Sequence, residues 1–420
     1  MNEAPVAASQ TRSALATDVA IVGGGVAGSS LGAVLAAAGL GVVVVEREAR
    51  FKDCVRGEAL HPWGAAEADR LGLIPTLRVS GAHPLPIWQR YEDRAPVDPY
   101  CWADDVPGGH VEWGVSHPDL QEALLRLAAE RGATVLRPAR ILDFRRGLSS
   151  ELVVAGDSGE VVVRPRLVVG ADGRRSGARR WVEAGTRSDP THHCIGGILL
   201  DGVALDPDRA HQAYHPGGMT IVFPRGQGRA RAYVVCDPAR AAALQGPNAP
   251  NAFVERLAAT LPDGAFAAAR PAGPAAVFPG TDTWSERIAD DGVVLVGDAA
   301  GANDPSQGHG LSLVFRDARE LRDLLLGESD WARAIAAFAD RRAAYHAVLR
   351  AHAQWAGVLI TEEGPEADAR RERAARAREI DPTAGGFAGI YAFGPDGLVG
   401  DEAARRRFFG EDLVPSVAAR

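Results

Sequence analysis

The sequence predicts an α/β protein in which a Rossmann-like parallel-sheet domain, assembled from separate segments, carries an inserted antiparallel sheet and ends in helices. Residues 18–46 form the pattern of an apolar strand, a glycine turn, a small-residue helix and a second apolar strand, which is typical of a βαβ unit. Residues 194–236 contain long extended segments separated by turns, which indicates an antiparallel sheet. After residue 311 the pattern is mostly helical.

The elements between these anchors follow from local signals in chain order. Apolar residues at helical spacing with glycine stops predict helices, and alternating apolar runs predict strands. The segment 224–229, PRGQGR, predicts a hairpin turn. The expected helices are one within 56–78 that ends at RLGL (70–73), 117–133, 251–268 and those after 311, including the arginine-rich, solvated 367–380. The expected strands lie in 134–146, 151–156, 160–173, 194–205, 219–224, 229–236 and 292–298.

Composition narrows the classes of protein to which the chain can belong. It has 420 residues, 46% of them hydrophobic, and a net charge of −8, which argues against nucleic acid and anionic membranes as partners. The first 16 residues lack a basic start followed by an apolar run, and the most apolar segment is broken by glycines. We therefore expect a soluble cytoplasmic protein with a disordered tail over 1–16. Four cysteines without a C-x-x-C pair predict neither a disulfide framework nor a metal site: Cys54, Cys101, Cys194 and Cys236.

A glycine motif follows the first predicted strand and opens the first helix. Gly23 permits a tight turn, Gly25 allows a pyrophosphate to approach the backbone, and Gly28 allows close packing of helix and strand. Val26 and Ala27 lie between them, at the helix start where free N–H groups favour anions. Glu46 ends the second strand, where a carboxylate holds ribose hydroxyls. The sequence therefore predicts a dinucleotide site, which this motif alone assigns to neither NAD nor FAD.

Two later motifs extend the pattern. Asp172-Gly173 follows the strand RLVVG, and Gly297-Asp298 follows VVLV and precedes a loop with Pro305, Gly308 and Gly310. Together with the glycine motif and Glu46, these resemble the single-component (group A) FAD-dependent monooxygenases, which share the fold of para-hydroxybenzoate hydroxylase. The resemblance covers roughly residues 18–350. It implies a discontinuous FAD-binding domain (17–80, 117–185 and 285–350), a substrate-binding domain (81–116 and 186–284) and a C-terminal helical region (351–420).

The resemblance also implies roles for individual residues in binding non-covalent FAD. Asp298 can accept hydrogen bonds from the ribitol hydroxyls, and backbone N–H groups at the helix beginning near Leu311 would face the flavin and stabilise negative charge on it. Asp172 is a cofactor contact; a local salt bridge between Asp172 and Arg179, or a turn cap, is an alternative that can hold as well. The remaining cofactor contacts that we expect are Arg47, Arg56 (on the pyrophosphate), His117, Gln121 and the loop residues Pro305, Gly308, His309 and Gly310.

The family resemblance implies an oxygenation reaction. NADPH or NADH would reduce the flavin, which would react with O₂ at C4a and pass one oxygen atom, through a C4a-hydroperoxide, to an aromatic or polycyclic hydrophobic molecule in secondary metabolism. His309 and His215 are candidate proton-handling residues. Alternation along the strands sends part of the inserted sheet toward the substrate, and the candidate lining residues are Tyr214, Met219, Ile221, Phe223 and Tyr233. We expect a monomer or homodimer.

Other reactions on the same fold remain open. Gly301 stands where the family usually has histidine, and GDAAG also occurs in geranylgeranyl-type reductases. Flavin-dependent halogenases share the RGEAL-x-PW character of 56–63, but they use a lysine downstream of that segment and a W-x-W-x-I-P signature. Lys52, the only lysine, lies upstream, and no W-x-W is present. A purely binding protein of the Rab escort type is a further alternative, which the flavin-suited loop after Asp298 disfavours.

Overall fold

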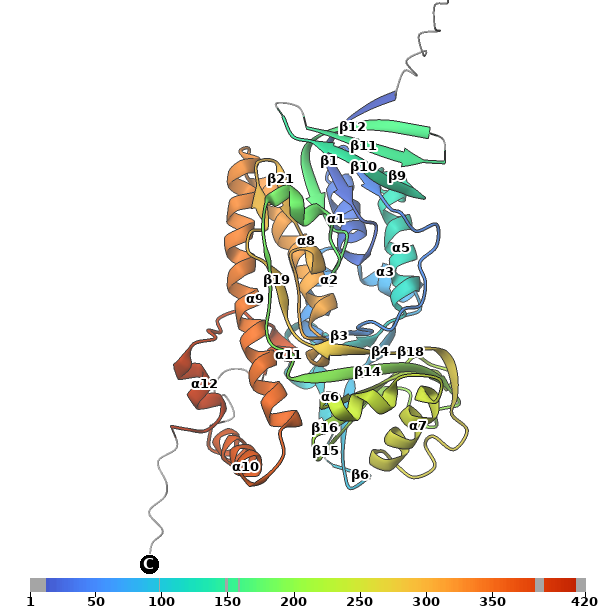
Figure 1. Ribbon diagram of the computed structural model, residues 1–420, viewed down its shortest axis with the longest axis vertical. Coiled ribbons are helices and arrows are strands. Elements are labelled where there is room, and N and C mark those ends of the chain that lie inside the picture. The colour runs from blue at the N-terminus through green and yellow to red at the C-terminus, as the bar shows by residue number, and fades with distance from the viewer. Residues whose placement is uncertain (1–12, 98, 148–149, 158, 382–388, 413–420) are drawn as a thin grey trace, which may run out of the picture.

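The computed structural model describes residues 13–97, 99–147, 150–157, 159–381 and 389–412. Two large sheets lie at opposite ends of the molecule, and one long helix runs along both (Figure 1). The first sheet has the order β10 (Ala139–Arg145), β11 (Glu151–Gly156), β12 (Gly159–Gly170), β1 (Ser13–Val22), β2 (Val42–Val45) and β9 (Thr134–Leu136). Strand β21 (Val293–Leu295) also pairs with β12 and with β20 (Ala289–Asp290).

The first sheet is a parallel core with an antiparallel extension. β1 pairs in parallel with both β2 and β12, and β21 pairs in parallel with β12. β10, β11 and β12 form an antiparallel meander. Helices α1 (Val26–Ala37), α5 (His117–Glu130) and α8 (Gly310–Gly327) contribute the apolar side chains that cover one face, so the predicted α/β fold class is confirmed.

The inserted sheet is mainly antiparallel. Its order is β18 (Arg270–Gly280), β14 (His193–Asp201), β17 (Ala230–Cys236), β16 (Gly218–Pro224), β15 (Arg209–His215), β5 (Ile87–Glu92) and β6 (Ala95–Pro96), with β7 (Tyr100–Cys101) on β5. The predicted hairpin turn joins β16 to β17, which pair in antiparallel register. One face packs on α7 (Ala249–Thr260) around Phe253 and Leu257, and the opposite face carries Met219, Ile221 and Phe223.

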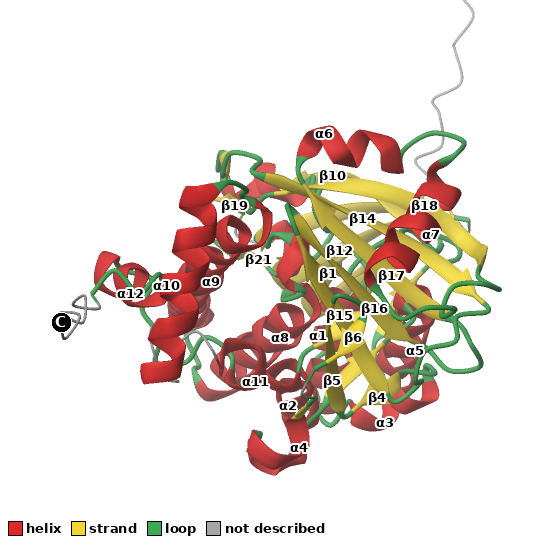
Figure 2. Cartoon of the chain, turned by 90° about the horizontal axis from the view of Figure 1, so that it is seen from below, coloured by secondary structure: helices red, strands yellow, loops and turns green. Residues whose placement is uncertain are grey.

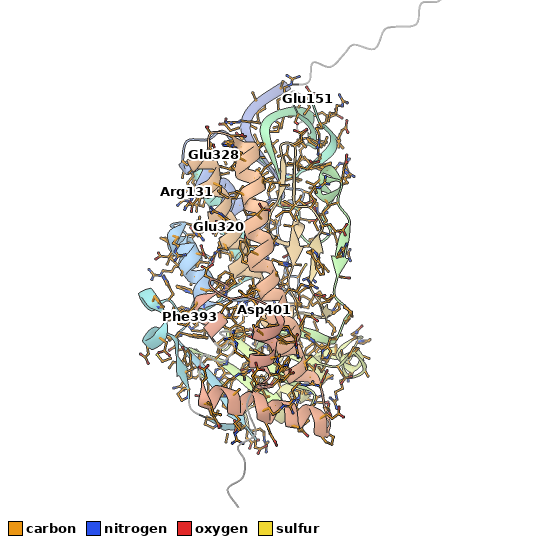
Figure 3. All side chains as sticks on the ribbon, turned by 90° about the vertical axis from the view of Figure 1, so that its left-hand side faces the viewer. Arg131, Glu151, Glu320, Glu328, Phe393 and Asp401 are labelled. Atoms are coloured by element: carbon orange, nitrogen blue, oxygen red, sulfur yellow. The ribbon has the colours of Figure 1, made fainter. Side chains whose placement is uncertain are left out.

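Short elements and the C-terminal helices complete the chain. α8, α9 (Trp331–Thr361) and α2 (Pro62–Arg70) gather on one side of the strands (Figure 2). From the α9 side, Glu320 and Glu328 lie on one half of the molecule and Phe393 and Asp401 on the other (Figure 3). The other short elements are α3 (Ile74–Val79), α4 (Trp102–Asp105), α6 (Pro238–Ala241), α10 (Pro365–Ile380), α11 (Ile390–Phe393) and α12 (Glu402–Phe408), with strands β3 (Ala59–Leu60), β4 (His83–Leu85), β8 (Glu112–Gly114), β13 (Thr186–Ser188), β19 (Thr283–Ser285) and β22 (Gly301–Ala302).

Several expectations about the elements need correction. Residues 13–16 of the expected tail belong to β1, because they pair with residues 161–164 of the long strand β12; residues 1–12 lie outside the described part of the chain. The helix expected within 56–78 is α2, which ends at Arg70 in the RLGL stretch as predicted, because the chain turns at Gly72, where φ is +66°; α3 follows. The predicted helix 251–268 ends at Thr260, and the predicted domain boundary at 350 lies inside α9.

Candidate cofactor and substrate site

A cavity of about 1440 Å³ is lined by residues of both large sheets. Pockets for one small molecule usually measure about 300–1,000 Å³. The cavity therefore has room for a dinucleotide with a second molecule beside it. Its walls contain nearly all of the residues that the sequence marks as cofactor or substrate contacts, brought together from segments far apart in the chain.

The glycine motif forms a cradle at one end of the cavity. Gly23 has φ of +108°, and a Cβ there would lie 2.4 Å from the Ala171 carbonyl oxygen. A Cβ at Gly28 would lie 1.9 Å from the Gly23 oxygen, so Gly28 serves packing and does not line the cavity. Helix α1 begins directly after Gly25 without a side-chain cap, which leaves its first N–H groups available to an anion. Val26 and Ala27 lie on the wall beside them.

Glu46 is held in place by the backbone around it. Its Oε2 accepts a hydrogen bond of 2.7 Å from the Gly24 N–H, and its Oε1 accepts one of 2.7 Å from the Glu48 N–H. These bonds fix the carboxylate at the end of β2 while lone pairs remain for ribose hydroxyls. Arg47 follows at the cavity rim with its side chain largely exposed.

The Asp172 loop and the Asp298 loop are tied to each other. Asp172 Oδ2 accepts hydrogen bonds from the N–H groups of Gly177 (2.7 Å) and Ala178 (3.1 Å), so the expected turn cap is present. Arg179 donates to the carbonyl oxygens of Asp298 (2.7 Å) and Ala299 (2.8 Å). Both aspartates line the cavity.

The loop before α8 brings bare backbone to the cavity wall. Gly308 has φ of +69°, and a Cβ there would lie 2.8 Å from His61 Nε2. α8 begins at Gly310 without a side-chain cap. Pro305, Gly308, Gly310 and Leu311 all line the cavity. Two uncapped helix starts, α1 and α8, therefore face one cavity, and this donor set fits the phosphates and the electron-accepting ring of FAD.

His61, which the sequence analysis did not identify, braces this loop. Its Nε2 donates to the Gln307 carbonyl oxygen at 2.8 Å, and its Nδ1 lies 3.2 Å from Glu112 Oε1. Burial lowers the pKa of His61, but the attraction of the buried Glu112 and the bonds to Glu112 and Gln307 outweigh it, so the pKa is raised. Glu112 lies far from His61 in the sequence, so no local signal marks the pair.

Arg56, His117 and Gln121 lie together on the cavity wall. The Arg56 carbonyl oxygen accepts a hydrogen bond of 2.5 Å from the Tyr233 hydroxyl. His117 Nδ1 lies 3.3 Å from the Gly57 oxygen, and burial together with the charge of Arg56 lowers the pKa of His117 to about 4. A neutral His117 can donate one hydrogen bond or accept one beside the positive Arg56.

A buried ion-pair cluster holds the segment that carries Arg56. Arg231 on β17 donates to Glu58 Oε2 at 2.8 Å and to Asp53 Oδ1 at 2.7 Å. Arg225 also donates to Glu58, at 3.3 Å. The inserted sheet thereby fixes both ends of residues 53–58 against the cavity.

The inserted sheet supplies an aromatic wall. All five predicted substrate contacts line the cavity: Tyr214, Met219, Ile221, Phe223 and Tyr233. Trp88 and Trp102 also line the cavity, although no sequence pattern predicted them. Their rings pack edge to face at 6.1 Å, with Phe223 against Trp88 at 6.0 Å. Ile360 and Tyr391 from the C-terminal helices are two further unpredicted lining residues.

The two histidines proposed for proton handling do not line the cavity. His309 is fully buried at the start of α8, with its ring stacked on Tyr391 at 5.3 Å. Burial, with His61 and His352 nearby, holds its pKa well below the ordinary value. His215 follows Tyr214 on β15, and because successive side chains alternate, it faces away from the cavity when Tyr214 faces it. Burial lowers the pKa of His215 as well.

Comparison with protein families gives one match over most of the chain. Residues 16–354 match the FAD binding domain family. The 3-demethoxyubiquinol 3-hydroxylase of Escherichia coli is 27% identical over 77% of this chain and 83% of its own length. The digeranylgeranylglycerophospholipid reductase 2 of Methanothermobacter thermautotrophicus is 30% identical over 72% of this chain and 76% of its own length.

Solved structures of the same fold include enzymes of more than one reaction type. PqsL of Pseudomonas aeruginosa, a probable FAD-dependent monooxygenase, has a TM-score of 0.70 and 23% identity, covering 82% of this chain and 96% of its own. The myxobacterial chondrochloren halogenase CndH has a TM-score of 0.73 and 18% identity over 96% of this chain and 98% of its own.

Within the residues that the structure describes, no helix is both long enough and apolar enough to cross a membrane. In the same part of the chain, no group of three or more His, Cys, Asp or Glu side chains is arranged to hold a metal ion.

Proposed function

Because the chain belongs to the group A FAD-dependent monooxygenases and is therefore an FAD-dependent oxidoreductase, we propose that it uses NADPH or NADH and O₂ to transfer one oxygen atom to a flat, hydrophobic aromatic or polycyclic molecule. The redox chemistry, hydride acceptance and oxygen activation, is what bound FAD supplies. We further propose that the enzyme acts in the cytoplasm and in secondary metabolism, as is common in this family.

The proposal is supported by one cavity with two different walls, one suited to a dinucleotide and the other lined by aromatic rings. At one end, the uncapped start of α1, Glu46 and Arg56 suit phosphates and ribose hydroxyls. Asp298 is placed to hold the hydroxyls of the ribitol chain, and the start of α8 is placed to stabilise negative charge on the ring. These residues bind and orient the cofactor.

The other wall suits an aromatic substrate. Trp88, Trp102, Phe223 and Tyr233 present ring faces and edges, and aromatic rings gain most from stacked or edge-to-face partners. Gln212 lies among them and accepts a hydrogen bond of 3.1 Å from Trp88 Nε1. The protein contributes positioning and exclusion of water.

A reductase of isoprenoid double bonds is the second candidate. The observation that favours it is the 30% identity to the digeranylgeranylglycerophospholipid reductase 2. The aromatic wall favours a flat ring system over a flexible isoprenoid chain.

Halogenation is disfavoured by the place of the single lysine. Lys52 lies exposed on the cavity rim, beside Cys54 and upstream of the Arg56 segment, whereas halogenases use a lysine downstream of that segment.

Oxygen labelling under ¹⁸O₂, compared with a reaction under nitrogen, separates the two reactions. The FAD-loaded protein would be mixed with NADPH or NADH, ¹⁸O₂ and a panel of polycyclic phenols and isoprenoid lipids, and the products analysed by mass spectrometry. A product with one ¹⁸O atom, formed only with O₂, supports the proposal. A product that gains two hydrogens without O₂ assigns the reductase reaction instead.

A further inference from the structure

We propose that Ser306, His193 and His192 form a path that delivers a proton from solvent to the cavity. This inference rests on the proposed function in one respect. Oxygen transfer converts substrate, NAD(P)H, O₂ and one proton into oxygenated substrate, NAD(P)⁺ and water, so each turnover consumes a proton. Reduction of a double bond by NAD(P)H consumes one as well, and the path therefore serves either candidate reaction.

The path is continuous from the cavity wall to the surface. Ser306 lines the cavity, and its Oγ lies 2.9 Å from His193 Nε2. His193 Nδ1 lies 3.4 Å from His192 Nδ1. The His192 side chain is 33% exposed, and its Nε2 lies 3.5 Å from the carboxylate of Glu362 at the surface. Imidazole rings carry protons between two nitrogens, which suits this sequence of contacts.

The fold makes a slot for the buried His193 ring. A Cβ at Gly280 on β18 would lie 2.3 Å from His193 Nε2, and a Cβ at Gly357 on α9 would lie 3.0 Å from its Cε1. Residues with side chains at these two positions would displace the ring. The ring is thereby placed between β18 and α9 with one nitrogen toward Ser306 and the other toward His192.

The surrounding donors determine the direction of the hydrogen bonds at the outer end. Thr361 donates its only hydroxyl proton to the Gly357 carbonyl oxygen at 2.8 Å. Its Oγ1 lies 3.2 Å from His192 Nδ1 and must accept there, so His192 Nδ1 carries a proton. That proton also faces His193 Nδ1, which is then the acceptor, and the His193 proton lies on Nε2.

The hydrogen-bond directions at the cavity end of the path are determined by Asp304 and Gln307. Asp304 Oδ2, fully buried, lies 3.0 Å from His193 Nε2 and favours a proton on that nitrogen. Gln307 Nε2 donates to Ser306 Oγ at 2.9 Å, and Gln307 Oε1 accepts a hydrogen bond of 2.7 Å from the Tyr391 hydroxyl. Ser306 Oγ therefore accepts from Gln307 and His193, and its own proton is left for an acceptor in the cavity.

One inward transfer balances in four moves. A solvent proton binds His192 Nε2, and the His192 Nδ1 proton passes to His193 Nδ1. The His193 Nε2 proton passes to Ser306 Oγ as the Ser306 hydroxyl proton passes to the acceptor in the cavity. No group is oxidised or reduced. Before the next transfer, a proton from solvent water that enters the open cavity passes outward by the same moves in reverse, which returns the three side chains to their first state.

The protonation pattern can be measured without turnover. Long-range ¹H–¹⁵N NMR on the full chain, labelled at histidine, identifies which nitrogen of each ring carries the proton, and His193→Gln assigns the His193 signals. We expect His193 protonated at Nε2 with Nδ1 bare. A bare Nε2 with a proton on Nδ1 would overturn the proposal, because that ring cannot donate to Ser306.

Turnover of three variants supplies a second readout. His193→Gln can still donate to Ser306 but cannot relay a proton, and we expect NAD(P)H oxidation to slow by about 10²-fold. His192→Ala should slow similarly and recover as imidazole buffer is added, since removal of the partly exposed ring leaves space for free imidazole; His193→Gln should not recover. His346→Gln is the matched control, a buried histidine on α9 that is not part of the path.

The two readouts fail in different ways. Equal turnover of His193→Gln and His346→Gln, or no recovery of His192→Ala with imidazole, would overturn the path while leaving the oxygen-labelling result intact. A protein that never oxidises NAD(P)H would overturn the proposed function, and the NMR result would still decide whether the path is polarised inward.

Discussion

At the scale of single residues, the carboxylate of Glu46 shows how backbone contacts define a binding group. It accepts from two backbone N–H groups at 2.7 Å each, so it cannot rotate away from the cavity. In Glu46→Gln one of these N–H groups would face an amide NH₂. We expect FAD to bind about 10- to 100-fold more weakly, because a charge-assisted hydrogen bond contributes about 1.5–3 kcal/mol.

Titration of the FAD-free variant with FAD, followed by flavin fluorescence, measures the effect. Glu48→Gln is the control, since its side chain forms only a rim contact of 3.4 Å with Arg47; we expect a loss of less than about threefold, typical of an exposed pair. Equal losses in both variants would contradict a specific role for Glu46.

A buried histidine, His352, is expected to lower the stability of the folded protein as the pH falls. Burial lowers the pKa of His352 to about 3, below its value of about 6.5 in the unfolded chain. Between about pH 6.5 and pH 3, the unfolded chain therefore binds a proton at His352 that the folded protein does not bind. The contribution of the neutral His352 to the free energy of unfolding is complete above about pH 6.5 and is lost as the pH is lowered. The loss is about 1.4 kcal/mol per pH unit for this group.

Urea unfolding at several pH values between 7 and 5 tests this. His352→Gln should flatten the dependence of the unfolding free energy on pH. His83→Gln should not; His83 is a partly exposed histidine on β4 that donates to the Pro207 carbonyl oxygen. An unchanged slope in His352→Gln would show that its protonation does not contribute.

At the scale of elements, β17 is joined to the cavity segment 53–58 by the buried Arg231. Arg231→Met leaves Glu58 buried without its main partner, and removal of one member of a buried pair costs about 3–5 kcal/mol. We expect that loss of stability in denaturant, together with weaker FAD binding through the displaced Arg56.

Arg229→Met provides a close comparison for this change. Arg229 immediately precedes β17 and also forms an ion pair, with Asp201 at 2.7 Å, but its side chain is 49% exposed. Exposed pairs contribute about 0–1 kcal/mol. Similar losses in the two variants would mean that the Arg231 cluster is no stronger than a surface pair.

At the scale of the whole molecule, α9 connects the two ends of the cavity. Near its middle, Arg342 donates to the carbonyl oxygens of Gly297 (3.2 Å) and Gly301 (2.9 Å) and to Asp317, and thus holds the loop that carries Asp298. Near its end, Gly357 borders His193 and Ile360 lines the cavity. One helix therefore positions a predicted cofactor contact and part of the wall proposed to bind substrate.

Arg342→Lys tests this connection. A lysine cannot reproduce the several directed N–H bonds of a guanidinium, and we expect faster release of FAD, measured by dilution of the loaded protein. Arg341→Lys, whose side chain is exposed and pairs with Glu320, should release FAD at the normal rate. Equal rates of FAD release from both variants would show that the hydrogen bonds of Arg342 do not hold the Asp298 loop in its binding position.

The sequence predicts the features of this molecule that depend on neighbouring residues. The glycine motif, Glu46 and the loop after Asp298 are each specified by a strand, a turn and a helix in succession, so their places on the cavity wall could be predicted. The pairs His61–Glu112 and Ser306–His193 join segments distant in sequence. For His309, the direction of the ring depends on Tyr391 in a later helix, and no local pattern contains that information.

Lys52 has a practical consequence for measurement. It is the only lysine in 420 residues, and it lies at the rim of the cavity. An amine-reactive dye can therefore attach at one side chain, in addition to the terminal amine, and will stand beside the entrance without any engineered attachment point. The fluorescence intensity or emission wavelength of the dye would then report the binding and release of a ligand in the cavity in real time.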